Sequence, residues 1–582
     1  MRFNLSYRDM EEKITGSEIL IRALADNGAD CVFGYPGGQI MPVYDKIYNN
    51  PYGVRHYLAR HEQGAIHAAE GYARATGRTG VVITTSGPGA MNLLTGLADA
   101  LIDSTPIVAI SGQVGSSMLG KDAFQESDVI SSVLPVTKWA LQVRRPEDIA
   151  PAISRAFYIA NSGRPGPVVI DLARDAQVGK AAYEKQEPPF IRSYDSDPEP
   201  EEGAIEEAAR LLNAAERPLV LAGHGVIISG GEKALASLAE KAGLPVGCTM
   251  LGLSSLPSDH PQNVGMLGMH GNLGPNINTN KADVILAVGM RFDDRVTGDV
   301  RKYAPNARII HIDIDASEFD KMIRCDVHVH SDARKALEAL LPIVDGKDRS
   351  EWRRSFDKHR KVEEDRVMAR ETACKAPDGK MLMGGVVRKI SEAFGNDAVI
   401  VTDVGQNQMF GVKYSKFNRS RSLISSGGLG TMGYGLPAAI GAKIGVPDRT
   451  VVLFCGDGGL QMTVEELGMI MEYGIDVKII LLNNNYLGNV RQWQHLFYNG
   501  RYSSTPMVNP DFRMLAGAYG IGAADVADAS ELDSAIAEMK AHDGAFLLNV
   551  NIDETDMVFP MTPGGNGVDE ILLNESEYYK PV

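Results

Sequence analysis

The segment from residue 451 to 494 contains polar residues whose types and spacing suit the binding of a metal ion and a phosphate. Asp457 stands between Gly456 and Gly458 after an apolar run, and Asn484 follows the next apolar run 27 positions later. A carboxylate oxygen and an amide oxygen suit a hard divalent cation such as Mg²⁺, which also takes ligands from a phosphate. The glycines allow the backbone to approach that phosphate. The segment therefore predicts a metal and phosphate site.

Two strands and a helix must position these residues. Residues 451–454 and 477–482 are apolar runs of strand length, and Thr463 with Glu466 forms a T-x-x-E helix-capping signature between them. A strand-helix-strand unit of this kind is parallel and right-handed. Asp457 and the asparagines after the second strand are therefore expected to converge at one edge of a sheet.

The composition limits the classes of partner. The 582 residues are enough for about three or four domains, and the net charge of −16 argues against nucleic acid or an anionic membrane as the main partner. No apolar run approaches the roughly 20 residues of a membrane helix, and the first residues resemble neither a signal peptide nor a transit peptide. We expect a cytoplasmic protein.

The five cysteines, Cys31, Cys248, Cys325, Cys374 and Cys455, are scattered without C-x-x-C spacing. Such spacing suggests neither a disulfide framework nor a zinc site. We expect these side chains to be buried and to behave as small apolar groups.

Alternating strand and helix patterns predict an α/β protein with three doubly wound parallel-sheet domains, the central one Rossmann-like. The expected domains are residues 14–182, 203–345 and 378–560, and residues 561–582 form a tail that could act as a lid. A proline-rich acidic linker covers 185–202. Nucleotide binding by the central domain is a weakly specific expectation from this pattern.

Several motifs of the first domain have two readings. Glu62 lies at the entrance of a predicted helix, where a carboxylate commonly does no more than interact favourably with the helix dipole. Residues 86–90, SGPGA, could be a helix-N-terminal anion site or only a tight turn. The backbone around Gly38 could hold a substrate oxygen, and residues 116–128 form a polar loop.

The chain resembles the large catalytic subunits of acetohydroxyacid synthase, also called acetolactate synthase, from about residue 15 to 575. The resemblance rests on FGYPGGQIMPVYD, RHEQGA, TSGPGA, KDAFQESD, GRPGPV, MLGMHG, RFDDRVTG, HIDID, TDVGQNQM, GTMGYGLPAA, GDGGLQM, LNNNYLG and VRQWQHLFY. It implies a thiamine diphosphate-dependent enzyme with an N-terminal pyrimidine-binding domain, a central FAD-associated domain and a C-terminal domain for the diphosphate and Mg²⁺.

The resemblance also implies roles for particular residues. Glu62 matches the glutamate that hydrogen-bonds N1′ of the aminopyrimidine, and Met432 matches the residue that holds the cofactor bent. The implied thiamine diphosphate residues are Glu62, Pro88, Gln406, Gly430, Met432, Gly456 and Gly458, and the implied metal ligands are Asp457, Asn484 and the backbone oxygen of Tyr486. The implied FAD residues are His270, Gly289, Arg291 and Asp313. The implied catalytic residues besides Glu62 are Gly38 and Gln125, and the implied substrate residues are Phe124, Arg174, Arg295 and Trp493.

The implied reaction decarboxylates pyruvate and transfers the two-carbon unit to a second 2-ketoacid, pyruvate or 2-ketobutyrate, in the biosynthesis of isoleucine and valine. The cofactors would be thiamine diphosphate, Mg²⁺ and FAD, the last without a net redox part. The resemblance further implies a homodimer or homotetramer with its active site at the subunit interface, and allows a small regulatory subunit.

Other readings remain open. Met432 and Trp493 could be ordinary core residues, and Arg295 could pair with a neighbouring aspartate. The alternatives for the whole chain are another thiamine enzyme with FAD, such as pyruvate oxidase, the flavin-free catabolic acetolactate synthase, or a scaffold that binds cofactor without catalysis. The chain departs from the plant and fungal pattern at Gly115, Arg174, Phe410 and Asn489, which border the implied access channel. Acceptor preference is not predicted.

Overall fold

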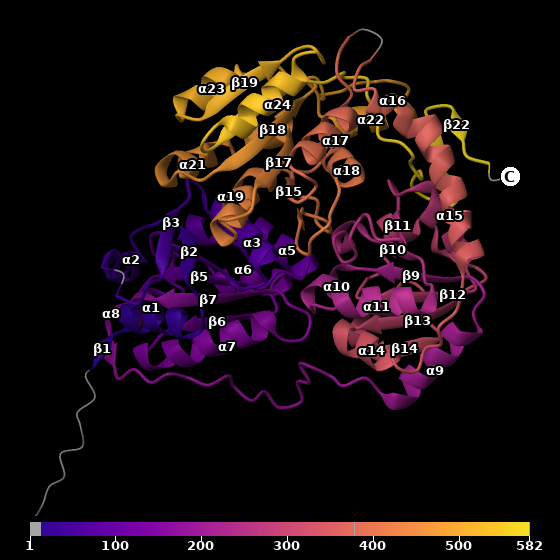
Figure 1. Cartoon of the computed structure of the whole chain (residues 1–582). Coiled ribbons are helices and arrows are strands. Elements are labelled where there is room, and N and C mark those ends of the chain that lie inside the picture. The colour runs from indigo at the N-terminus through magenta and orange to yellow at the C-terminus, as the bar shows by residue number, and fades with distance from the viewer. Residues whose placement is uncertain (1–12, 50, 377–378, 581–582) are drawn as a thin grey trace, which may run out of the picture. The chain divides into compact units, whose positions relative to one another are not determined.

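A computed structural model describes residues 13–49, 51–376 and 379–580. The chain divides into two compact units, Met1–Tyr194 and Asp195–Val582. The first unit contains one six-stranded sheet and the second contains two (Figure 1). None of the helices in these described ranges is long and apolar enough to cross a membrane.

The sheet of the first unit is parallel, with the order β3-β2-β4-β5-β7-β6. Its strands are β2 (Cys31–Gly34), β3 (Arg55–Leu58), β4 (Gly80–Thr84), β5 (Ile107–Gln113), β6 (Trp139–Val143) and β7 (Pro167–Ala173). Helices α1 (Gly16–Asp26) and α7 (Ile149–Asn161) cover one face, and α3 (Glu62–Thr76) and α5 (Leu94–Ile102) cover the other (Figure 1).

Helix α1 forms where the sequence predicts it. The Thr15 hydroxyl accepts the Glu18 N–H at 3.3 Å and so caps the first turn. Ile19, Leu20 and Leu24 recur on one face of the helix and are at most 1% exposed, which docks α1 on the sheet.

The central sheet of the second unit has the parallel order β11-β10-β9-β12-β13-β14. Its strands are β9 (Pro218–Ala222), β10 (Val246–Cys248), β11 (Asn263–Met266), β12 (Val284–Val288), β13 (Arg308–Asp313) and β14 (Val327–His330). Counted within the sheet this order is 3-2-1-4-5-6, the Rossmann arrangement. The flanking helices include α9 (Glu202–Ala214), α11 (Glu232–Ala242), α12 (Leu273–Thr279) and α14 (Ala333–Leu340).

The third sheet has the parallel order β16-β15-β17-β18-β20-β19. Its strands are β15 (Val399–Thr402), β16 (Leu423–Ile424), β17 (Val451–Gly456), β18 (Val477–Asn483), β19 (Gly522–Val526) and β20 (Phe546–Asn551). Its helices include α17 (Met383–Ala393), α18 (Gln406–Tyr414), α19 (Gly435–Gly445), α20 (Asp457–Met462), α21 (Leu467–Tyr473), α22 (Gly488–Phe497), α23 (Phe512–Ala518) and α24 (Leu532–Ala541). The predicted fold class, three α/β domains with parallel sheets, is confirmed.

The connection after β17 differs from the prediction. Helix α20 begins at Asp457 itself, and α21 begins at Leu467 after a short 3₁₀ turn. The predicted capping role of Thr463 is wrong, because its hydroxyl donates instead to the carbonyl of Gly433 at 2.8 Å. Thr463 therefore bonds to a residue 30 positions away in the sequence instead of capping the helix that follows it.

The tail packs against the central domain of the second unit. Gly567 bridges Gly298, Thr562 N–H donates to the Met269 carbonyl at 2.8 Å, and Tyr579 hydrogen-bonds His359 of α15 (Ser350–Glu363). Strands β21 (Leu572–Asn574) and β22 (Glu577–Tyr578) form a short antiparallel hairpin in this tail. All five cysteines are buried and free, as the sequence predicts.

Candidate active site and cofactor-binding sites

Asp457 is the first residue of α20, directly after the carboxyl end of β17. Its side chain is 1% exposed, and loss of solvent raises the pKa of the carboxyl above its usual value. A buried carboxylate in this position is best compensated by a cation or by hydrogen bonds. The site is thus chemically suited to a bound metal.

Asn509 hydrogen-bonds Asp457 and two asparagines at or just after the end of β18. Its amide Nδ2 lies 2.7 Å from Asp457 Oδ2, 3.0 Å from Asn483 Oδ1 and 3.1 Å from Asn485 Oδ1. Its own oxygen accepts from Gln461 Nε2 at 3.0 Å, which fixes the orientation of the amide. One amide donor therefore lies among oxygens of the predicted metal loop. Sequence reasoning missed Asn509, because it belongs to a loop 52 positions after Asp457 without a recognisable motif.

Asn484 lies at the other side of the same loop. Its Oδ1 accepts the Tyr486 N–H at 3.1 Å, and its Nδ2 lies 3.3 Å from Gln406 Oε1. Gln406 in turn donates to Gln492 Oε1 at 3.1 Å and to the Asp556 carbonyl at 2.9 Å. The structure thus joins three of the predicted site residues, Asn484, Tyr486 and Gln406, in one hydrogen-bonded network.

Glycines make room at this site. A Cβ on Gly458 would lie 2.7 Å from Leu487 Cδ2 and 3.6 Å from Met432 Cε, so Met432 and Gly458 are neighbours. Gly456 ends β17, and Gly430 adopts a positive φ of 71°. Asp403, to which sequence reasoning gave no role, holds this turn, since its carboxylate accepts the N–H groups of Gly433 and Gly435.

Glu62 in the first unit is the first residue of α3. Asn92 Nδ2 donates to its Oε2 at 2.9 Å. A Cβ on Gly89 would lie 3.2 Å from the other oxygen, Oε1, so no side chain covers that oxygen from this direction. One carboxylate oxygen is held and the other is left accessible from the glycine turn.

The turn after β4 presents hydroxyl groups beside Glu62. Thr85 Oγ1 and Ser86 Oγ are buried without a hydrogen-bond partner in the protein. Pro88, the first residue of the short helix α4 (Pro88–Met91), follows Gly87. Buried hydroxyls of this kind are normally satisfied, so their state fits a site that receives a polar ligand.

The remaining predicted residues of the first unit form two groups. Arg174 Nη1 donates to the Gly38 carbonyl at 2.8 Å, and nothing lies within 4 Å of a Cβ placed on Gly38. Gln125 adopts a positive φ of 59°, and its carbonyl would be 2.8 Å from a Cβ on Gly87. Phe124 beside it is 85% exposed.

The polar loop that carries Gln125 is organised by Glu126. Its carboxylate accepts the Lys121 and Ala123 N–H groups at 3.3 and 3.0 Å and a short bond from Gly120. These bonds, the one from Ala123 above all, hold the pKa of the Glu126 carboxyl below its usual value.

The central domain brings glycines together at the switch point of its sheet, between β9 and β12. A Cβ on Gly223 would lie 2.1 Å from the Gly289 carbonyl oxygen, and Gly225 N–H donates to that oxygen at 3.0 Å. Dinucleotides bind at such crevices, where glycines let the backbone approach the phosphates.

The other predicted FAD residues surround the ends of neighbouring strands. His270 is 5% exposed, its Nδ1 has no partner in the protein, and burial together with the nearby Lys413 and Arg295 lowers its pKa to about 3. Asp313 ends β13, and Arg291 Nη2 lies 3.6 Å from Asp293 Oδ2. The unpartnered His270 nitrogen and the glycine crossing fit a large polar ligand in this domain.

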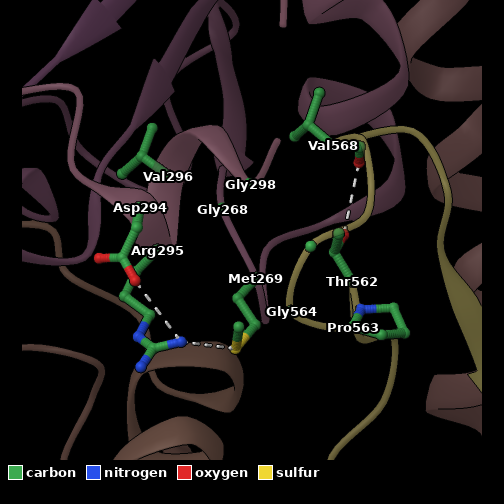
Figure 2. Close-up of a pocket in the computed structure, with 11 residues that line it drawn as sticks. Gly268, Met269, Asp294, Arg295, Val296, Gly298, Thr562, Pro563, Gly564 and Val568 are labelled. Carbon is green, nitrogen blue, oxygen red and sulfur yellow. Dashed lines mark hydrogen bonds and ion pairs between the residues drawn. The ribbon is translucent and has the colours of Figure 1, made fainter. Parts of the chain in front are cut away.

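Arg295 lines a pocket between the end of the central sheet and the tail (Figure 2). Its Nη1 lies 3.8 Å from Asp294 Oδ2 and 3.9 Å from Met269 Sδ. Thr562, Pro563 and Gly564 of the tail form the opposite wall (Figure 2). The exposed pair with Asp294 is weak, so the guanidinium is available to a carboxylate ligand.

Trp493 lies on α22 and is 37% exposed. On the same helix, Asn489 has a buried Oδ1 without a partner in the protein. Phe410 is 1% exposed and stacks on Tyr414 with ring centroids 5.9 Å apart. Phe410 is thus a core residue of the third domain.

Comparison with protein families identifies the class. The chain matches the models "Thiamine pyrophosphate enzyme, N-terminal TPP binding domain" over residues 14–132, "central domain" over 205–340 and "C-terminal TPP binding domain" over 403–550. The central model spans all six strands of its sheet, and the other two models each match the larger part of one sheet.

Full-length relatives narrow this class. The chain is 41% identical over 575 residues to the acetolactate synthase isozyme 3 large subunit of Escherichia coli K12, covering 97% of this chain and all of the relative. It is 42% identical to the isozyme 2 large subunit of the same organism, covering 96% and 99%, and 42% identical to the acetolactate synthase large subunit of Corynebacterium glutamicum, covering 96% and 90%. The chain belongs to the acetolactate synthase large-subunit family.

Proposed function

We propose that this chain is the catalytic subunit of an acetolactate synthase that uses thiamine diphosphate, Mg²⁺ and FAD. It would decarboxylate pyruvate and join the two-carbon unit to pyruvate or 2-ketobutyrate, giving 2-acetolactate or 2-aceto-2-hydroxybutyrate. The observation that carries the proposal is the buried Asp457 at the start of α20, which the Asn509 amide links to the asparagine oxygens at the next strand end. This donor set suits a metal that holds a diphosphate.

The residues of the third domain would hold Mg²⁺ and the diphosphate. Asp457, Asn484 and the Tyr486 carbonyl would be the metal ligands, and the backbone at Gly456, Gly458, Gly430 and Gln406 would approach the phosphates. Asn509 would orient the Asp457 carboxylate. Met432, beside Gly458, would support the bend of the cofactor. When bound, thiamine diphosphate supplies the carbanion chemistry that joins the two carbon units.

Glu62 would hold a proton at Oε1 for the aminopyrimidine, because Oε2 is engaged by Asn92 and Oε1 faces the turn at Gly89. Pro88 and the hydroxyls of Thr85 and Ser86 would line the pyrimidine side. The Gly38 N–H and the Gln125 side chain would stabilise negative charge on the substrate oxygen. From the resemblance to acetolactate synthase large subunits we infer a homodimer or homotetramer with the active site at a subunit interface.

Substrate selection would fall to groups around the access route. Arg295 would meet the carboxylate of the acceptor, Trp493 would favour the larger acceptor, and Phe124 and Arg174 would border the same space. His270, Gly289, Arg291 and Asp313 would hold FAD in the central domain. Since the named relatives are large subunits, we also infer a smaller partner subunit that regulates this one.

The test supplies purified chain with pyruvate, thiamine diphosphate, Mg²⁺ and FAD, and measures acetolactate after its conversion to acetoin. Adding 2-ketobutyrate in competition measures the acceptor preference. We expect acetolactate without any electron acceptor. Carbon dioxide release that depends on an added electron acceptor and gives no acetolactate would instead support an oxidase.

A further inference from the structure

A group of metal-ligating side chains lies at the edge of the central sheet, outside the residues used above. Asp320 and Cys325 belong to the connection between β13 and β14, and His328 belongs to β14. One ligand atom from each of these three residues lies within 4.8 Å of the other two. The sequence spacing of cysteine and histidine here is C-x-x-H.

The distances are close to those around a tetrahedral ion. Zinc bonds of about 2.0–2.1 Å to nitrogen and oxygen and about 2.3 Å to sulfur imply separations of roughly 3.3 Å between N and O ligands and roughly 3.6 Å between S and N. His328 Nε2 lies 3.1 Å from Asp320 Oδ1. Cys325 Sγ lies 3.8 Å from the Nδ1 atom of His311, on the neighbouring strand β13.

His311 has the tautomer that a ligand needs. Its Nε2 lies 2.9 Å from the Met290 carbonyl oxygen, which can only accept, so the proton of the neutral ring is on Nε2. The unprotonated Nδ1 therefore faces Cys325. A hydrogen bond from the distal ring nitrogen to a carbonyl is the usual support of a metal-bound histidine.

The backbone already holds the other ligands in place. His311 and His328 are register partners on adjacent strands, so their side chains share one face of the sheet. Asp320 accepts the Cys325 N–H at 2.8 Å, and Phe319 stacks on His328 with centroids 4.9 Å apart. Asp320, Cys325 and His328 therefore stand together as three ligands, and His311 adjoins them through Cys325.

We propose that Asp320, Cys325 and His328, with His311 as the fourth ligand, form a site for a Zn²⁺-class transition metal ion. The thiolate and imidazole donors separate it from the Mg²⁺ site, because Mg²⁺ prefers oxygen ligands. The absence of C-x-x-C spacing predicts no zinc site, but this ligand set comes from two strands and their connection. The bound ion would hold the connection between β13 and β14, which follows Asp313, against strand β14 at the edge of the sheet.

A second group of three ligands in the described part of the chain is less suited. His67, Glu70 and Asp99 are fully buried, and His67 Nδ1 lies 2.9 Å from Glu70 Oε1. This group has no thiolate and no exposed route for a hydrated ion. We therefore assign the metal to the Cys325 group alone.

The experiment loads chelator-treated full-length chain with Co²⁺ in the presence of excess Mg²⁺. We expect one Co²⁺ per chain, a near-ultraviolet thiolate-to-cobalt charge-transfer band, and visible bands of tetrahedral intensity that Zn²⁺ abolishes. Cys325→Ser should lose the charge-transfer band, and Asp320→Asn should weaken Co²⁺ binding about tenfold, a loss of the size seen for altered metal shells. Cys248→Ser, which changes a buried cysteine of β10 in the same domain, is the matched control.

Circular dichroism of each variant separates loss of the site from loss of the fold. Asp320→Asn keeps an oxygen that accepts the Cys325 N–H, so it serves if Cys325→Ser does not fold. No charge-transfer band at stoichiometric Co²⁺ in the original chain would overturn the proposal. A band that persists in folded Cys325→Ser would overturn it as well.

Discussion

The first and third sheets have the same topology but different chemistry at their strand ends. Counted within each sheet, β3-β2-β4-β5-β7-β6 and β16-β15-β17-β18-β20-β19 both have the order 2-1-3-4-6-5. The third strand in sequence is β4 in one sheet and β17 in the other. Strand β4 leads into Thr85 and Ser86, whose hydroxyls have no partner, whereas β17 leads into the buried Asp457.

The second strands differ in the same way. Strand β3 is followed by Glu62, which retains partial exposure and has one oxygen held by Asn92. Strand β16 is followed by the glycine turn that Asp403 holds at Gly433. A shared topology thus sets where functional groups can stand, while the connecting segments decide which groups these are. In the proposed function, one sheet would present a proton-transferring carboxylate and the other a metal-binding one.

Glu62→Gln should have the largest effect, because it removes the titratable group from the first sheet and leaves the third untouched. We expect acetolactate formation to fall at least ~10²-fold, the lower end of general acid–base contributions. Bound flavin, measured by its absorbance, should remain. Glu147→Gln, on an exposed turn, is the matched control. Near-normal turnover of Glu62→Gln would contradict the proposal that Glu62 transfers a proton while Asp457 binds the metal.

Asp457→Asn alters the corresponding group of the third sheet. The substitution keeps the shape but removes the charge that would hold Mg²⁺, so we expect acetolactate formation to fall by about tenfold or more at a fixed Mg²⁺ concentration. Raising Mg²⁺ should restore part of the rate, whereas it should not help Glu62→Gln. Equal response of both variants to Mg²⁺ would contradict the assignment of separate roles.

Asn509→Ala tests whether the amide at 2.7 Å from Asp457 positions the metal ligand. We expect the half-saturating Mg²⁺ concentration to rise about tenfold with little change in the rate at saturation. The readouts are the Mg²⁺ dependence of the rate and of thiamine diphosphate binding. Asn306→Ala, an exposed asparagine of the central domain, should change neither. An unchanged Mg²⁺ dependence in Asn509→Ala would show that the amide is only structural.

Gly459→Ala should lower the stability of the third domain, because it disturbs the Asp403 carboxylate that holds the glycine turn at Gly433. Its Cβ would lie 2.2 Å from Asp403 Oδ1, and the backbone N–H groups of Val404 and Gly433 hold that carboxylate in place. We expect destabilisation of about 1–3 kcal/mol, seen as a lower thermal midpoint.

Gly517→Ala is the counterpart with the smallest expected effect. Gly517 is also helical, on α23, but nothing lies within 4 Å of an added Cβ. We expect a gain of about 0.5 kcal/mol, because alanine favours the helix. If Gly517→Ala lowered the thermal midpoint as much as Gly459→Ala, the destabilisation would come from replacing any helical glycine and not from the contact with Asp403.

Much of the fold was predictable because buried parallel strands are continuous apolar runs and helices repeat their apolar residues. The expected strand at 451–454 is β17, and the expected helix after Thr15 is α1. The start of α20 and the partner of Thr463 were not predictable, since the Gly433 carbonyl that accepts from Thr463 is 30 positions away. The roles of Glu62, Arg295 and Trp493 came from the resemblance and stay proposals.

The sequence by itself determined the three parallel-sheet domains, the family, and the positions of Asp457 and Asn484 after their strands, because these depend on local periodicity and short motifs. Only the tertiary structure decided which distant groups meet. It brought Asn509 to Asp457, Gly223 to Gly289, and Asp320, Cys325 and His328 to His311. Each contact depends on strand register and on how connections fold back, and local sequence carries little of that information.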